Sequence, residues 1–115
     1  MTLTNTSSAA TDIIAVDGKT SVEVVATAMT AITGTFAQVK AATITADTAN
    51  TISTDTDYDA TISDASIAAT DLIELDGDTS GTVTAQAATI TGTATNVLTA
   101  IQSEETANTT DYDVL

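Results

Sequence analysis

Residues 2–26, TLTNTSSAATDIIAVDGKTSVEVVA, occur a second time at residues 61–85 as TISDASIAATDLIELDGDTSGTVTA. The two stretches are identical at 13 of 25 positions, and several other exchanges replace one aliphatic side chain by another. The tetrapeptide ITGT also occurs twice, at residues 32–35 and 90–93, with an offset of 58 instead of 59. Matches in this number and in the same order indicate a duplicated unit.

The duplication extends to the last residues of the chain. TDYD at residues 56–59 recurs at residues 110–113, an offset of 54, so the loops of the unit tolerate deletions. We therefore divide the chain into repeat unit 1, residues 1–60, and repeat unit 2, residues 61–115. The second unit stops at residues 114–115, where the first continues with ISD, so we expect its last strand to be incomplete.

Stretches in which Thr, Val and Ile alternate with other residues are typical of strands, because alternation presents one face to the core. Segments with apolar residues three and four positions apart are typical of short helices. The expected strands are residues 3–5, 22–27, 61–63 and 82–86, with a last one beginning at Val114. The expected helices are residues 9–16 and 35–42 in unit 1 and residues 68–75 and 93–102 in unit 2.

Small polar residues and glycines predict the ends of these elements. Ser7 and Ser66 are expected to cap the first helix of each unit, and Gly18 and Gly77 to end it in a left-handed conformation. ITGT is expected to close a strand, turn at its glycine and cap the second helix. The apolar residues expected to face inward are Ile13, Ile14, Val16, Phe36, Val39, Leu72, Ile73, Leu75, Val97, Leu98 and Ile101.

The order strand, helix, strand, helix, with half-units of about 25–30 residues, predicts an α/β repeat solenoid. Its short strands would stack in parallel, one per coil, with short helices on the other side, in coils comparable in size to leucine-rich repeats. The alternative is an all-β chain of tandem sandwich modules or β-solenoid repeats, because threonine also suits exposed β surface.

Charge excludes several classes of partner. The chain has 16 acidic residues against Lys19 and Lys40, a net charge of −14, so it cannot neutralise a nucleic-acid backbone. It also lacks an apolar run of the length that a membrane-spanning helix needs, and we expect no membrane insertion. The acidity indicates either a soluble, self-repelling surface or binding of divalent cations.

The acidic segment DTDYDA places carboxylates at every second position, at Asp55, Asp57 and Asp59, and the second copy keeps Asp111 and Asp113. In a loop, such spacing can surround calcium with oxygen ligands, so calcium is a possible cofactor. The segment lacks the glycine and the final glutamate of an EF-hand loop. If it enters a strand instead, the alternating aspartates mark the solvent face.

Enzymatic activity is not expected. The chain contains no His, no Cys and no Arg, so it lacks a base suited to neutral pH, a thiol nucleophile and a guanidinium clamp for anions.

Residues 62–101 contain Ile-Ser-Asp, Ala-Thr-Asp-Leu, Thr-Ser-Gly-Thr-Val and Ile-Thr-Gly-Thr-Ala. This string resembles the tandem repeats of very large secreted or cell-surface proteins of bacteria, particularly cyanobacteria, of the adhesin or hemolysin type. The resemblance implies an extracellular structural or adhesive role, commonly with calcium in the surroundings. The glycine-rich nonapeptide that binds calcium in hemolysin-type proteins is absent.

We therefore expect an extracellular structural repeat module of a bacterial surface or fibre-forming protein. It would act as a rigid spacer or filament building block through strand stacking between repeats. The expected partners are adjacent repeats, in a fragment of a giant protein, or copies of the chain stacked head to tail. The alternative is a calcium-dependent adhesive or binding module.

Overall fold

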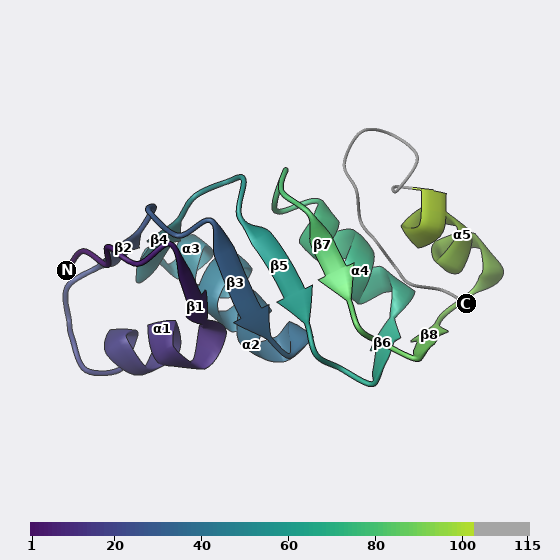
Figure 1. The fold of residues 1–115 in the computed structure, drawn as a ribbon, viewed down its shortest axis with the longest axis horizontal. Helices are drawn as coiled ribbons and strands as arrows, with labels where there is room; N and C mark the ends of the chain where they lie inside the picture. Colours follow the sequence, from purple (N-terminus) through teal and green to yellow (C-terminus); the bar gives the residue numbers. More distant parts are fainter. Residues whose placement is uncertain (103–115) are drawn as a thin grey trace.

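The computed structural model describes residues 1–102, which form short strands and short helices in regular succession (Figure 1). In chain order the elements are β1 (Ser7–Ala9), α1 (Ala10–Asp17), β2 (Val24–Ala26), β3 (Ala31–Gly34), α2 (Phe36–Lys40), the π-helical turn η1 (Ala41–Thr45), α3 (Ala46–Ala49), β4 (Ile52–Thr54), β5 (Asp59–Ile62), β6 (Ser66–Ala68), α4 (Ala69–Asp76), β7 (Val83–Ala85), β8 (Thr89–Thr91) and α5 (Ala94–Gln102).

Every strand pair in residues 1–102 is parallel. The central sheet has the order β1-β3-β5-β7, and the pairs β2-β4 and β6-β8 form two smaller sheets. Figure 1 shows the four central strands side by side, with the helices following in chain order along the longest axis. The molecule measures 43 × 24 × 21 Å. The expected α/β class with short parallel strands and short helices is confirmed, and the all-β alternative is wrong.

The first helix of each unit lies within one residue of its expected position, at α1 and α4, but its caps differ. Ser7 and Ser66 lie in β1 and β6, and the N-cap residues are Ala9 and Ala68, which make no side-chain cap. Each strand runs straight into its helix, so no loop residue is available for capping. An aspartate in the first turn of each helix supplies favourable charge instead.

The prediction that Gly18 and Gly77 adopt a left-handed conformation is also wrong. Gly18 and Gly77 have φ of −64° and −73°, which is right-handed helical backbone. The chain continues the turn beyond each helix, and the Gly18 amide donates to the Ile14 carbonyl at 2.9 Å. The left-handed helix end is found elsewhere, at Asn50 after α3, with φ of 56°.

The ITGT prediction is confirmed at its first occurrence. β3 ends at Gly34, and Thr35 caps α2 through a capping box in which the Gln38 amide nitrogen donates to the Thr35 hydroxyl and the Gln38 side chain accepts from the Thr35 amide. The helix then continues through η1 and α3, well beyond the expected end at Ala42. In η1 the buried Thr43 hydroxyl donates to the Val39 carbonyl at 2.9 Å.

Several short strands were not expected from sequence. β2 and β7 fall inside the predicted segments 22–27 and 82–86, and β5 overlaps residues 61–63. Residues 3–5 form no strand; only Thr2 pairs, with Val25. The missed strands β1, β4 and β6 consist of Ser, Ala, Thr and Ile with no clear alternation. The strand expected at Val114 lies outside the described residues.

The core is a single cluster of small aliphatic side chains with one methionine and one tyrosine. Its buried members are Ala10, Ile13, Val24, Ala26, Met29, Ile32, Val39, Ala42, Ala46, Ile52, Tyr58, Ala60, Ile62, Ile67, Ala69, Leu72, Leu75, Val83, Ala85 and Ala100. Of the residues expected to face inward, Leu98 is 54% exposed, because α5 turns Ala100 toward the core instead. The expectation for Leu98 is therefore wrong, while Phe36 and Val97 are half-buried against the cluster.

Candidate functional site

The acidic segment lies in the connection between β4 and β5 and enters β5 at Asp59. The Asp55 carboxylate accepts a hydrogen bond from the Thr56 amide at 2.8 Å, and the Asp59 carboxylate accepts one from the Thr82 amide at 2.7 Å. Asp57 is exposed. Of the three expected calcium ligands that lie in the described residues, Asp55 and Asp59 thus already accept from backbone amides, and the Asp59 bond ties this connection to the residue before β7.

The alternation of the segment continues into the strand. Asp57 and Asp59 are exposed, whereas Tyr58, Ala60 and Ile62 are buried. The aspartates therefore lie on the solvent side of a chain that inserts every second residue into the core. Tyr58 was missed by sequence reasoning, although the period of two that marks Asp57 and Asp59 as outward also marks Tyr58 as inward.

Tyr58 is the centre of a hydrogen-bonded corner between the start of β5 and the turn after α4. It is 1% exposed, and its hydroxyl donates to the Asp78 carboxylate at 2.6 Å. The Thr79 hydroxyl donates to the Tyr58 carbonyl at 2.6 Å and accepts from the Gly81 amide at 3.0 Å. A Cβ on Gly81 would clash with the carbonyls of Asp57 and Tyr58, so only glycine fits here.

Burial is the main reason that the pKa of the Tyr58 phenol lies well above its usual value. The hydrogen bond to the negatively charged Asp78 raises this pKa further, and an opposing effect of Thr43 is smaller. The phenol is therefore neutral near pH 7 and acts as a hydrogen-bond donor. In this state it serves as a structural link, because a base or nucleophile would need the ionised oxygen.

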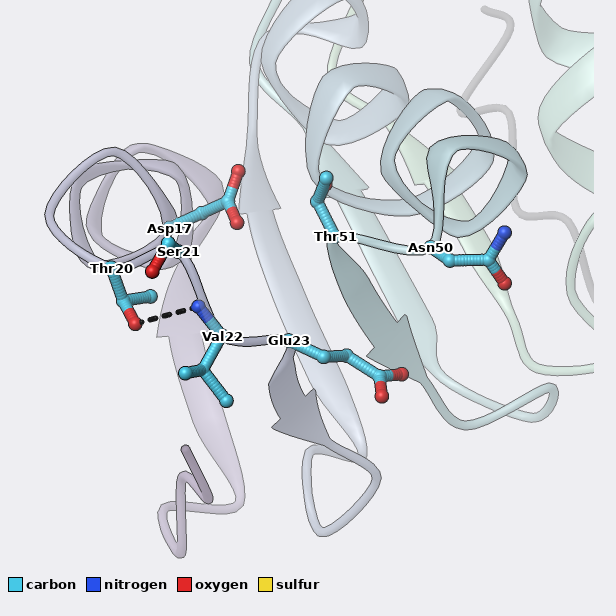
Figure 2. A pocket seen from close by; sticks show the side chains of 7 residues that line it. All are labelled: Asp17, Thr20, Ser21, Val22, Glu23, Asn50 and Thr51. Carbon is cyan, nitrogen blue, oxygen red and sulfur yellow. Dashed lines mark hydrogen bonds between the residues drawn. The ribbon is translucent and has the colours of Figure 1, made fainter.

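A small open depression lies beside the turn after α1 and the corner between α3 and β4 (Figure 2). Its volume is about 110 Å³, far below that of a typical small-molecule site. The Thr20 hydroxyl accepts from the Val22 amide at 3.0 Å, and Val22 is 63% exposed. The lining residues are Asp17, Thr20, Ser21, Val22, Glu23, Asn50 and Thr51. The depression offers room for a few water molecules.

No three or more His, Cys, Asp or Glu side chains of residues 1–102 form a group that could hold a metal ion. Asp111 and Asp113 lie outside this part of the chain. Calcium at Asp55, Asp57 and Asp59 therefore stays a prediction.

The chain carries far more negative than positive side chains. Of the two lysines, Lys40 forms an ion pair with Glu74 at 2.7 Å and also lies over the Phe36 ring at 5.7 Å. Lys19 is exposed in the turn after α1. Among residues 1–102, no helix has both the length and the apolar character needed to cross a membrane.

Comparison of the chain with protein-family models, with curated proteins and with solved structures gave no match in any of the three. The hydrogen bonds around Tyr58 connect the start of β5 to the segment between α4 and β7.

Proposed function

We propose that the chain is a structural repeat module, in which the two units form one continuous α/β solenoid that acts as a rigid spacer or filament building block. Residues 1–60 and 61–115 would be its two repeats. Stiffness would arise because each coil pairs its strands with the preceding coil and packs its helix on the preceding helix.

The spacing of paired residues supports a solenoid. In the five strand pairs, the first partners are Ser7 and Ala31, Val24 and Ile52, Ala31 and Asp59, Ala60 and Val83, and Ser66 and Thr89. Each turn of such a coil would therefore use about 23–28 residues, which lies in the range of solenoid repeats and close to the half-unit expected from sequence. Parallel pairing at this separation needs a crossover, which the helices supply.

The elements of the two halves correspond in the same way as their sequences. At the offset of the sequence alignment, β1, α1 and β2 correspond to β6, α4 and β7, and β3 corresponds to β8. The correspondence includes backbone detail, since Gly34 and Gly92 have φ of 158° and 155°. The Thr93 hydroxyl accepts from the Asn96 amide, as the Thr35 hydroxyl accepts from the Gln38 amide.

The observation that carries the proposal is the central sheet, which crosses the boundary between the units. β1 and β3 come from unit 1, β7 comes from unit 2, and β5 spans the boundary and pairs with both sides. Side-chain contacts also cross the boundary: among them, the Asp64 carboxylate accepts from the Phe36 amide at 2.6 Å, and Lys40 pairs with Glu74. A continuous sheet of this kind would hold successive repeats in one orientation.

An extracellular role in a bacterial surface or fibre-forming protein is supported by the resemblance to adhesin-type and hemolysin-type repeats. It is also supported by the net charge of −14, which would keep neighbouring arrays apart. The absence of His, Cys and Arg favours a structural role over catalysis. Calcium-dependent adhesion is the alternative function.

Fused copies of the chain test the solenoid. Val114 takes the place of Ala60 in the alignment and Thr2 that of Thr61, so joining Val114 to Thr2 of the next copy keeps the repeat in register. Each copy contributes four helical layers, and helices pack about 8–10 Å apart, so we expect each added copy to lengthen the particle by about 30–40 Å. Small-angle X-ray scattering of one, two and three copies measures this increment.

The cross-section should stay constant as the length grows. Copies joined through a flexible glycine-serine linker are the matched control and should scatter as independent beads with a smaller length increment. If the in-register fusions scatter like the linker control, the repeats do not stack and the proposal is wrong.

A further inference from the structure

We propose that the chain associates head to tail with a second copy of itself, through the outer edge of β8 and α5 on one copy and residues 1–5 and α1 of the next. This inference rests on the proposed solenoid and adds the surface, the register and the residues of the contact. Its basis is that the chain already contains this contact once, at the boundary between its two units.

Inside the chain, β3 of the first unit pairs with β5, which leads into the second. Thr33 lies opposite Thr61 and Gly34 opposite Ile62, and the Ser63 amide donates to the Gly34 carbonyl at 2.9 Å. This ladder fixes the register of one unit on the next.

The same two edges are present at the ends of the described structure. β8 is the counterpart of β3, and it pairs with β6 on one side while no residue of 1–102 pairs with its other side. Thr2 is the counterpart of Thr61: it lies opposite Val25, as Thr61 lies opposite Thr84. The open edge of residues 1–4 therefore corresponds to the edge of β5 that β3 covers.

Residues of the second ITGT segment are more exposed than their counterparts in the first, as expected if a second copy covers them. Gly34 and Thr35 are half-buried, whereas their counterparts Gly92 and Thr93 are exposed. Within residues 1–102, the second occurrence of this surface thus has no counterpart of the segment that covers the first.

The cap on the second helix follows the same correspondence. Asp64 accepts from the Phe36 amide across the unit boundary, and the counterpart of Asp64 is Asn5, an equally good capping residue. The Asn5 amide nitrogen donates to the Ser7 carbonyl at 2.9 Å, which leaves its oxygen as the acceptor for the Ala94 amide of the preceding copy.

The helices provide a second, independent indication. At the internal boundary Lys40 pairs with Glu74 at 2.7 Å. The counterpart of Lys40 is Leu98, which is 54% exposed, and the counterpart of Glu74 is Ala15, which is also exposed. Both charged partners are thus replaced together by apolar ones, so the contact between copies would bury an apolar pair where the internal boundary has an ion pair.

The contact does not extend to the corner around Tyr58. There, Gly81 leaves room for the carbonyls of Asp57 and Tyr58, and its counterpart in unit 1 is Val22. A valine side chain would exclude the equivalent approach. The proposed interface is therefore limited to β8 and α5 on one copy and to residues 1–5 and α1 on the next, and Val22, which is 63% exposed, is an apolar residue outside it.

A contact between two different surfaces does not close on itself, so association would be open-ended. The net charge of −14 opposes it at low ionic strength, and salt screens this repulsion. Sedimentation velocity of the full chain over a range of concentrations, at low and high sodium chloride, measures the association. We expect species of increasing size as concentration and salt rise.

Substitutions at the helix contact make the test specific. Leu98→Lys and Ala15→Glu each place one charge opposite an apolar side chain, and each should weaken association about tenfold. The double variant recreates the internal Lys-Glu pair between copies and should restore association toward that of the original chain. Val22→Lys is the matched control and should change association much less than Leu98→Lys, since it alters charge equally outside the contact.

All these residues are exposed, so thermal melts followed by circular dichroism should be similar for every variant and separate loss of contact from loss of folding. A chain that stays monomeric at all concentrations and salts overturns the head-to-tail contact. The contact is also wrong if Val22→Lys weakens association as much as Leu98→Lys does. A double variant that associates more weakly than both single variants would contradict it as well. If the in-register fusions still lengthen as expected, the solenoid stands and only the contact between copies is wrong.

Discussion

Tyr58 shows how a single side chain connects segments that lie far apart in the sequence. Its ring fills the core beside small aliphatic residues, while its hydroxyl reaches Asp78 and its carbonyl receives the Thr79 hydroxyl. Aromatic residues make up only 3% of the chain, and Tyr58 is the largest fully buried side chain among the described residues. The residue therefore combines packing with two hydrogen bonds that connect the start of β5 to the turn after α4.

The raised pKa of Tyr58 leads to an expected pH dependence. Because the folded-state pKa lies above the unfolded value of about 10, the neutral phenol stabilises the fold fully below that pH, and this stabilisation is lost as the pH rises through the folded-state pKa. We expect Tyr58→Phe to lower stability at pH 7 by about 1–2 kcal/mol, through loss of the bond to Asp78. Urea unfolding from pH 7 to pH 11 measures both effects.

The difference between the original chain and Tyr58→Phe should shrink above pH 10. Every other residue is the same in the two chains, so the comparison isolates the Tyr58 hydroxyl. A difference that stays constant up to pH 11 would show that the Tyr58 phenol ionises alike in the folded and unfolded states.

The helices of this chain differ in how they begin, and the difference follows from what precedes them. α1 and α4 continue directly from strands and have no side-chain cap, whereas α2 follows Gly34 and has the Thr35–Gln38 capping box. Helical periodicity together with the repeat offset was sufficient to predict α1 and α4 to within one residue. The short strands before them were not predictable, because Ser-Ser-Ala and Ser-Ile-Ala have little local preference for a strand.

The capping box predicts unequal effects of two equivalent substitutions. Thr35→Ala should lower the free energy of unfolding by about 1 kcal/mol, because it removes the acceptor of the Gln38 amide. Thr93→Ala, at the exposed start of α5, should cost less, since solvent can replace the lost acceptor there. Urea unfolding of both variants gives the comparison, and a larger loss for Thr93→Ala would contradict it.

The whole molecule is an elongated particle in which charge is almost entirely negative. Its one salt bridge within residues 1–102, Lys40–Glu74, is half-exposed and contributes little by itself. Repulsion among the 16 acidic side chains opposes the compact state. Any dissolved salt should screen this repulsion, whichever cation it contains. Calcium binding, by contrast, would depend on the particular cation.

Melting temperatures in matched salts separate these two effects. If the module is purely structural, sodium chloride should raise the melting temperature by screening, and calcium and magnesium at equal ionic strength should act alike. Asp57→Asn should leave this response unchanged, because Asp57 is exposed and counts only as one charge. A shift specific to calcium that Asp57→Asn abolishes would instead favour the calcium-dependent module.

The sequence by itself determined the internal similarity of residues 2–26 and 61–85, the positions of α1 and α4, the strand-to-helix turn at ITGT and the acidic, His-free and Cys-free chemistry, because each is a local pattern or a count. Tertiary structure decided which short strands pair, that β1, β3, β5 and β7 form one sheet, and that Tyr58 is buried while Leu98 is exposed. These features depend on hydrogen bonds and contacts between residues that lie far apart in the sequence, such as Ala60 and Val83. Such contacts exist only once the helices have returned the chain to the preceding strand, so the short strand segments by themselves contain too little information to predict them.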